Sequence, residues 1–384
     1  MLKPRKVTKI IATLAKIRDE MTEERDIAGF ASAFAAGILA ASFIPLSQIH
    51  STGLSASVFV LISMTLIMSK RFVQSGYFLQ WTAIVSAAFM TGVICFCGAA
   101  ISEVSSLHLP SAADSISIHL CNKFKTAIEA LPFANADSGA VLSAFLTGDK
   151  SSLSPRLTET FRESGAAHLL ALSGMHLGII YAMGAKLLSM MGNRPIIKQI
   201  RSLSILLFCG IYTLGTGAGE SISRAFLFIL LNELGSLSHR KTRLKEIMMA
   251  AMIIQLATDP LAIRSVSFQL SYAAMAGIAF IHPALKEFWP DDGKGPIKRI
   301  WEAASLSISC QLCTAPLAWI YFRSFPLNFL ITNLIAIPLT GVIIPLSIIT
   351  ICLQAAGICP DCAITATEWL IGLLCNSLDT IASL

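Results

Sequence analysis

The sequence predicts an all-α, polytopic membrane protein with about eleven transmembrane or re-entrant helices. Of its 384 residues, 54% are hydrophobic and only 14% are charged, whereas soluble domains carry about 25% charged residues. Apolar stretches near the length of a membrane span follow one another along the chain, and lysine and arginine gather between alternate pairs of them. In lipid every backbone polar group needs an internal partner, so this pattern indicates spanning helices.

The candidate spans differ in length, and several contain glycine or proline, which is typical of broken helices. In chain order they cover residues 28–49, 54–68, 78–100, 176–191, 203–215, 222–237, 247–258, 268–281, 303–320, 327–353 and 363–381.

The first 26 residues are predicted to form a basic amphipathic helix on the cytoplasmic face of the membrane. Val7, Ile10, Ile11 and Leu14 recur at helical spacing among lysines and arginines. Because cytoplasmic segments retain basic residues, we expect a cytoplasmic N-terminus and a location in the inner membrane. The net charge of +6 then serves contact with anionic lipids.

Four further parts follow: a three-span bundle (27–100), an extracytoplasmic segment (101–136), a long membrane domain (137–353) and a C-terminal membrane helix (354–384). The extracytoplasmic segment has apolar residues at helical spacing over 115–131, which predicts an amphipathic helix ended by Pro132. Two short helices are expected next, one over 137–146 stopped by Gly148 and one from the Ser154 cap to Glu163.

Polar side chains within apolar stretches are costly in lipid, so they are the candidate functional residues. They fall into groups: His168, Ser173, Gly174 and His176; Arg224 with Glu220 four residues before it; Gln269 and Ser271; Ser305 and Ser309 before Pro316; and Asn333 with Pro338 and Pro345 in a pattern expected of a helix broken at membrane depth.

Each group also has a structural interpretation. Ser305 and Ser309 are typical of helix-packing surfaces, and Arg224 could reach the outer interface and pair with Glu220. The two histidines could be neutral imidazoles bonded to backbone at a helix break. The functional interpretation is that all groups face one hydrated pathway between the helices.

Motifs of catalysis and cofactor binding are missing from the sequence. Ala171 takes the first glycine position of a nucleophile elbow, and neither an H-E-x-x-H run nor a phosphate-binding P-loop is present. We therefore expect no catalytic residue, no metal and no cofactor. Two alternatives stay open, a membrane-embedded hydrolase that uses Ser173 and His176, and a small-solute transporter.

The segment LTGDKSSLSPRLTETFRESGAAHLLALSGMHLGII resembles the signature of the competence domain in the ComEC-type DNA-uptake channel family. The resemblance continues in order through SISRAFLF, DPLAIRSVSFQLSYAAMAGI and TAPLAWIYFRSFPLNFLITNLIAIPLTG, and it makes 137–353 a competence-type domain. It implies an inner-membrane channel component that takes up single-stranded DNA during natural transformation.

The resemblance carries over to the substrate pathway the residues Asp149, His168, Ser173, Gly174, His176, Arg224, Gln269, Ser271 and Asn333. On this interpretation the chain enters the membrane as a broken or re-entrant segment, and Gly174 lets the backbone line the pathway beside Ser173 and His176. Pro316 and Pro338 match the later motifs.

The sequence departs from the family pattern in two domains. Residues 102–131 are too few for an OB-fold, which takes on the order of 70 residues, and no metal-binding motif of a metallo-β-lactamase-like domain follows Leu353. Besides single-stranded DNA and lipids, the expected partners are therefore a separate DNA receptor, a nuclease, and a cytoplasmic helicase or single-strand-binding protein. Homo-oligomerisation stays open, as does a substrate other than DNA.

Overall fold

The computed structural model describes residues 27–45, 48–67, 77–105, 112–192, 194–238, 242–288, 295–323 and 328–383. Within these ranges the elements are helices and no strand occurs, which confirms the predicted all-α class. The basic helix predicted for residues 1–26 lies outside the described residues. The chain divides into two compact units, residues 1–108 with 242–265, and residues 109–241 with 266–384.

Five helices in the described part of the chain are long and apolar enough to cross a membrane: Trp81–Ile101, Pro195–Gly215, Val266–Lys286, Ile297–Phe322 and Phe329–Ala355. Shorter apolar helices cover Ile27–Ala41 and Ser51–Ser63. Large apolar side chains such as Leu203 and Leu207 point outward from their helix and are 69% and 64% exposed. Such a surface is suited to lipid. The chain is thus a membrane protein, while the number of eleven spans stays a prediction.

The first unit contains the helix Ile27–Ala41, α2 (Ile49–Ile67), α4 (Tyr77–Ser105), α11 (Leu244–Thr258) and the 3₁₀ turn η3 (Pro260–Arg264). Glycines let its helices touch backbone to backbone, because a Cβ atom on Gly37 would lie 1.9 Å from the Phe89 carbonyl oxygen. Arg264 donates to the Ser42 carbonyl and lies 5.0 Å from the ring centre of Phe96. The segment 242–265 is therefore part of this bundle although it lies far away in sequence.

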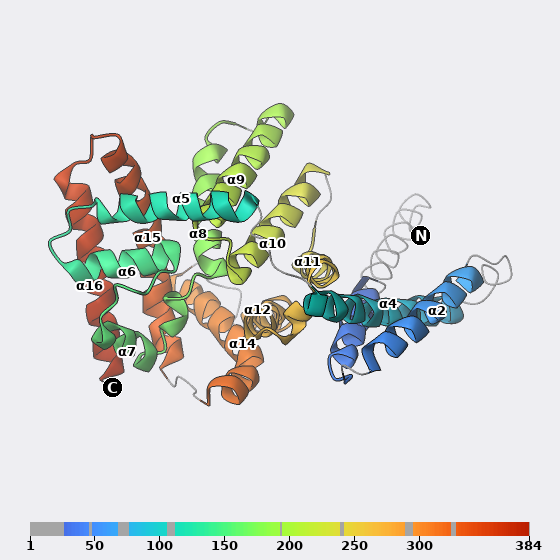
Figure 1. Cartoon of the computed structure of the whole chain (residues 1–384). Helices are drawn as coiled ribbons and strands as arrows, with labels where there is room; N and C mark the ends of the chain where they lie inside the picture. The colour runs from blue at the N-terminus through green and yellow to red at the C-terminus, as the bar shows by residue number, and fades with distance from the viewer. Residues whose placement is uncertain are drawn as a thin grey trace, which may run out of the picture. The chain divides into compact units, whose positions relative to one another are not determined.

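The second unit begins with α5 (Ala112–Glu129), α6 (Ala136–Thr147), α7 (Pro155–Glu163) and the 3₁₀ turn η2 (Ala167–Leu169). Helices α5 and α6 lie side by side (Figure 1). Asn135 caps the start of α6, and Gly148 ends it in the left-handed conformation at φ 75°. Ser154 caps α7 and Pro155 is its first residue. All three helices predicted from sequence in this region are present, and these capping residues bound the two short ones, α6 and α7.

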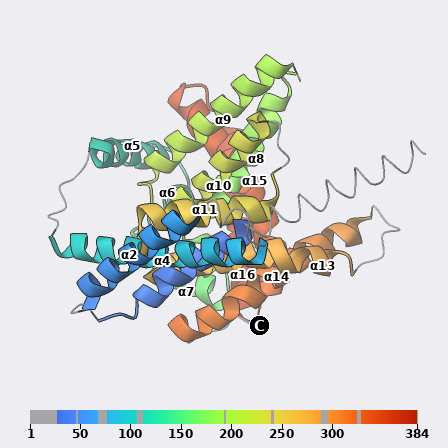
Figure 2. The same cartoon turned by 90° about the vertical axis from the view of Figure 1, so that its right-hand side faces the viewer.

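The rest of this unit consists of α8 (Gly174–Ser189), α9 (Pro195–Gly215), α10 (Glu220–Leu237), α12 (Val266–Ala276), the π-helical turn η4 (Gly277–Ile281), α13 (His282–Lys286), α14 (Pro296–Phe322), α15 (Phe329–Ala355) and α16 (Asp361–Ala382). Leu142, Phe145 and Leu146 of α6 are fully buried and lie in the core that α8, α9, α15 and α16 share. Helices α8 and α9 run side by side in Figures 1 and 2.

The helix break predicted at Pro338 and Pro345 is wrong, because α15 continues through both prolines from Phe329 to Ala355. Its buried side chains recur every three or four residues. They are Thr332, Ala336, Thr340, Ile343 with its neighbour Ile344, Ser347 and Thr350. This stripe packs against α16 and α8, and the packing outweighs the hydrogen bond that each proline removes. Helix α14 likewise continues through Pro316.

Ser305 and Ser309 line a close helix contact, as their structural interpretation predicts. Both are fully buried, and a Cβ atom on Gly277 would lie 2.2 Å from the Ser309 carbonyl oxygen. Helix α13 lies beside α14 (Figure 2), joined by an ion pair of 3.0 Å between Lys286 and Glu302. The two serines therefore allow the α12–η4 segment to approach α14.

Candidate functional site

Ser173 and His176 form the start of α8. Ser173 is extended (φ −125°, ψ 166°) and precedes the first helical residue. Its backbone N–H donates to His176 Nδ1 over 3.2 Å, and its Oγ lies 2.9 Å from the same nitrogen. Because Nδ1 accepts from an N–H, the neutral ring carries its proton on Nε2. His176 is fully buried, with its ring 5.9 Å from that of Phe145, and Nε2 has no hydrogen-bond partner within the described residues.

Gly174 is the first residue of α8 and does not have a positive φ. The chain is interrupted just before it, over residues 170–173, so the interruption predicted from sequence is present without special glycine geometry. A Cβ atom on Gly174 would lie 3.2 Å from the Cβ of Ala225. The glycine thus serves a close contact between α8 and α10, and α8 continues through Gly178.

His168 lies in the turn η2, where its Nδ1 is 3.2 Å from the Gly165 carbonyl oxygen and its side chain is exposed. Ser164 directly precedes Gly165, and its carbonyl oxygen accepts a hydrogen bond from the Thr332 hydroxyl of α15. The next residue, Asn333, has a buried Oδ1 without a hydrogen-bond partner in the described part of the chain. The turn that follows α7 is therefore in contact with the start of α15, and Asn333 lies one residue further along that helix.

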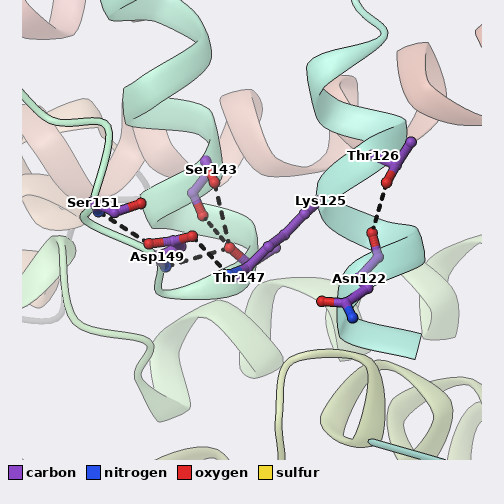
Figure 3. A network of polar contacts seen from close by, with 7 residues as sticks. All are labelled: Asn122, Lys125, Thr126, Ser143, Thr147, Asp149 and Ser151. Atoms are coloured by element: carbon purple, nitrogen blue, oxygen red, sulfur yellow. Dashed lines mark hydrogen bonds and ion pairs between the residues drawn. The ribbon is translucent and has the colours of Figure 1, made fainter. Parts of the chain in front are cut away.

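Asp149 stands in a network of polar contacts between α5 and the α6–α7 loop (Figure 3). Its Oδ2 is 2.7 Å from Lys125 Nζ, and its Oδ1 accepts from the Ser151 N–H over 3.0 Å. The hydrogen bond from Lys125, followed by those from Ser151, lowers the pKa of Asp149 to about 2. The same bond to Asp149 raises the pKa of Lys125. The ion pair between Asp149 and Lys125 therefore joins the amphipathic helix α5 to the α6–α7 loop of the membrane domain.

Arg224 is buried in α10, with a side chain that is 2% exposed. Its NH2 donates to the Ser267 carbonyl oxygen over 2.8 Å and to the Ser267 hydroxyl. NH1 is 3.7 Å from Oε2 of Glu220, whose side chain is 62% exposed. Nε and NH1 donate no hydrogen bond to any described residue. The pairing with Glu220 is as predicted, but the guanidinium turns inward to α12 rather than outward to the interface.

Gln269 joins α12 to α14, because its Oε1 accepts from the Tyr321 hydroxyl over 2.7 Å. Ser271 follows on the same helix and is partly buried. This hydrogen bond places Gln269 in a contact between helices.

Close contacts, mostly between neighbouring residues, link the segments that hold five of the predicted residues into one row: Asp149, Ser173, Gly174, His176 and Arg224. A Cβ atom on Gly148 would lie 3.3 Å from that of Leu172, and Gly174 adjoins Ala225. Arg224 then reaches Ser267. The row runs from the Asp149 loop across the first turns of α8 and α10 to the start of α12. Helix N-termini carry partial positive charge, so the row offers donors and positive potential to an anion.

Sequence reasoning missed the partners that complete this row. Ser267 lies 43 residues from Arg224, and no local spacing links the two. Tyr181 of α8 was also missed; its hydroxyl donates to the buried carboxylate of Glu233 in α10 and accepts from Asn232. The sequence signal that could have indicated Tyr181 is a tyrosine hydroxyl within an otherwise apolar stretch. No cluster of three or more His, Cys, Asp or Glu side chains that could hold a metal occurs in the described ranges.

A family model described as "Competence protein" matches residues 145–384, which is well over half of the chain. The chain belongs to the competence protein family. The matched region contains Asp149, Ser173, His176, Arg224 and the remaining residues of the row, so the resemblance seen in the sequence is confirmed.

Two curated relatives match this competence-family protein. ComE operon protein 3 of Bacillus subtilis (strain 168) is 26% identical over 202 residues, which cover 53% of this chain and 25% of the relative. Uncharacterized protein YcaI of Escherichia coli (strain K12) is 26% identical over 227 residues, which cover 57% of this chain and 29% of the relative. The chain thus matches between a quarter and a third of these relatives' length. No solved structure matches it.

Proposed function

We propose that the protein acts in competence DNA uptake, as the inner-membrane channel component through which single-stranded DNA passes, with its N-terminus in the cytoplasm. Membership of the competence family supports a role in uptake. The observation that carries the proposal is Arg224, a buried arginine with two nitrogens that donate no hydrogen bond to any described residue.

A DNA strand carries a negative charge at every phosphate, so its passage through lipid needs donors and positive potential along the route. The row beside Arg224 supplies both, because α8 and α10 begin there and Nε2 of His176 is an additional unpaired donor. Contacts to phosphates carry no sequence information. The pathway would therefore accept any base sequence.

In this proposal the protein conducts the strand and does not cut it. A separate receptor captures the DNA, a separate nuclease removes the second strand, and a cytoplasmic helicase or single-strand-binding protein draws in the first. Membrane lipids surround the apolar outer faces, and several copies could assemble.

A hydrolase is the second candidate, because Ser173 Oγ lies 2.9 Å from His176 Nδ1. The same nitrogen also accepts from the Ser173 backbone N–H. That bond occupies the lone pair that a general base would need, which favours helix capping over proton abstraction. Ester or amide cleavage by the purified protein that disappears in Ser173→Ala would overturn this preference.

A small-solute transporter on the same fold would instead leave transformation intact after deletion of the gene.

The first test replaces Arg224 by methionine and by lysine. Arg224→Met removes the donors at similar size, so transformation frequency in the host should fall by at least about tenfold, which corresponds to about 1.4 kcal/mol. Arg224→Lys keeps the charge but not the planar fork, and an intermediate frequency is expected.

The matched control is Arg162→Met, because Arg162 is an exposed arginine paired with Glu159 on α7. It should transform normally. Immunoblots of membrane fractions show whether all variants reach the membrane in equal amounts. Normal transformation by an abundant Arg224→Met protein would contradict the proposal.

A further inference from the structure

Hydrogen bonds to a single residue, Ser267, orient the guanidinium of Arg224. Its NH2 donates twice to Ser267, through the carbonyl oxygen and the hydroxyl at the start of α12. These two bonds fix the plane of the guanidinium without using Nε or NH1. Nε and NH1 therefore point in two defined directions, on opposite sides of the Nε–Cζ bond, and donate to no described residue.

Both pairs of guanidinium N–H groups that bind a phosphate or carboxylate in a bidentate manner include NH2, which is already bonded to Ser267, so Nε and NH1 can each donate only singly. Here neither Nε nor NH1 donates a hydrogen bond to a described residue, although the side chain is 2% exposed. Buried donors without partners are rare in folded proteins, and they require an explanation. An anionic oxygen at hydrogen-bond distance from NH1 would satisfy one of these two donors.

Glu220 is the anion beside NH1 in the present structure. Its Oε2 is 3.7 Å from NH1, which is an ion-pair distance but too long for a good hydrogen bond. The carboxylate is 62% exposed, so water can solvate it when it moves away from the buried guanidinium. Glu220 is also the first residue of α10, where the helix dipole favours an acid without Arg224.

We propose that Glu220 is a displaceable anion that holds the Arg224 site in the resting protein and yields it to a phosphate of the DNA strand. The exchange replaces the Glu220 carboxylate by a phosphate oxygen that accepts a hydrogen bond from NH1, and no covalent bond changes. Glu220 thereby sets the affinity of the site: it lowers binding of every anion, and a strand held by further phosphates along the row displaces it more readily than a small anion does. The inference rests on the proposed function only for the nature of the anion.

The test is a binding titration with the purified full-length protein in detergent. Two probes are used, a fluorescein-labelled single-stranded thymidine homopolymer and inorganic tripolyphosphate. Glu220→Gln keeps the size of the side chain and removes its charge, so it should tighten binding of both probes by about fivefold. The gain should be absent when Arg224→Met is added. Glu163→Gln, an exposed glutamate at the end of α7, is the matched control and should bind as the unmodified protein does.

The outcomes separate this inference from the proposed function. Tighter tripolyphosphate binding by Glu220→Gln, without binding of the DNA polymer by any variant, supports the displaceable anion and overturns the DNA pathway. DNA binding that depends on Arg224 but is unchanged or weakened in Glu220→Gln overturns the displaceable anion alone. A gain that persists together with Arg224→Met also overturns it, because the effect would then be general electrostatics.

A lipid headgroup presents the same phosphate chemistry, and a second arm distinguishes it. The titration is repeated in nanodiscs of zwitterionic lipid and in nanodiscs that contain anionic phosphatidylglycerol. We expect the gain from Glu220→Gln in both. Loss of the gain only in the anionic nanodiscs would assign NH1 of Arg224 to lipid and contradict the role proposed for the DNA strand.

Discussion

Asp149 and Arg224 both come from the competence motifs, but their surroundings give them different roles. Asp149 is partly exposed, and Lys125 and Ser151 satisfy its carboxylate. Arg224 is buried and only half satisfied. A satisfied charge between two elements stabilises a structure, whereas a buried donor without a partner indicates a ligand. We therefore interpret Asp149 as an attachment of α5 and Arg224 as the contact for substrate.

The attachment through Asp149 predicts a dependence of stability on pH. The pKa of the carboxyl group falls from its ordinary 3.8 to about 2 in the folded protein. Its stabilising contribution is therefore complete above pH 3.8, and it is lost as the pH falls toward 2. Unfolding in detergent, followed by tryptophan fluorescence, should show the unmodified protein losing its advantage over Asp149→Asn across this interval. A constant difference between the two proteins would contradict the role of Asp149.

The bounds of the short helices could be predicted from their capping residues. The course of the long helices was harder to predict, because it depends on packing against other helices. Asn135, Gly148 and Ser154 act within one turn of their own position, so the bounds of α6 and α7 could be inferred from sequence. The continuity of α15 through Pro338 could not, because it depends on the buried stripe that faces α16. The candidate site is likewise only partly predictable from sequence. The sequence indicates Arg224, but its hydrogen bond to Ser267 depends on how α10 and α12 pack in the fold.

The contact between η4 and α14 predicts a strong effect of a single methyl group. In Gly277→Ala the new Cβ would meet the Ser309 carbonyl oxygen at 2.2 Å, and the helices would have to separate, at about 3 kcal/mol. Gly178→Ala is the matched control, because no atom lies within 4 Å of its Cβ position in α8. Alanine there should be neutral or stabilise by up to about 1 kcal/mol. Equal unfolding midpoints of the two variants in detergent would refute this contact.

The whole molecule is a membrane protein of two compact units, and the row of polar groups lies entirely in the second. This unit also contains nearly all of the family match, which begins at residue 145. The first unit includes α11, so the sequence between α10 and α12 is shared between the two units. Sequence reasoning predicted a continuous domain over 137–353, because hydropathy does not report which bundle a helix joins.

Photo-crosslinking during uptake tests the central claim that a DNA strand passes the Arg224 row. A photoreactive amino acid is placed at Glu220, next to Arg224, and for comparison at Leu203, an outward-facing residue of α9 that is 69% exposed. Cells then receive labelled DNA and light. The proposed pathway predicts that a single labelled strand becomes attached at position 220 and none at position 203. Equal attachment at both positions, or none at 220 while transformation proceeds, would contradict it.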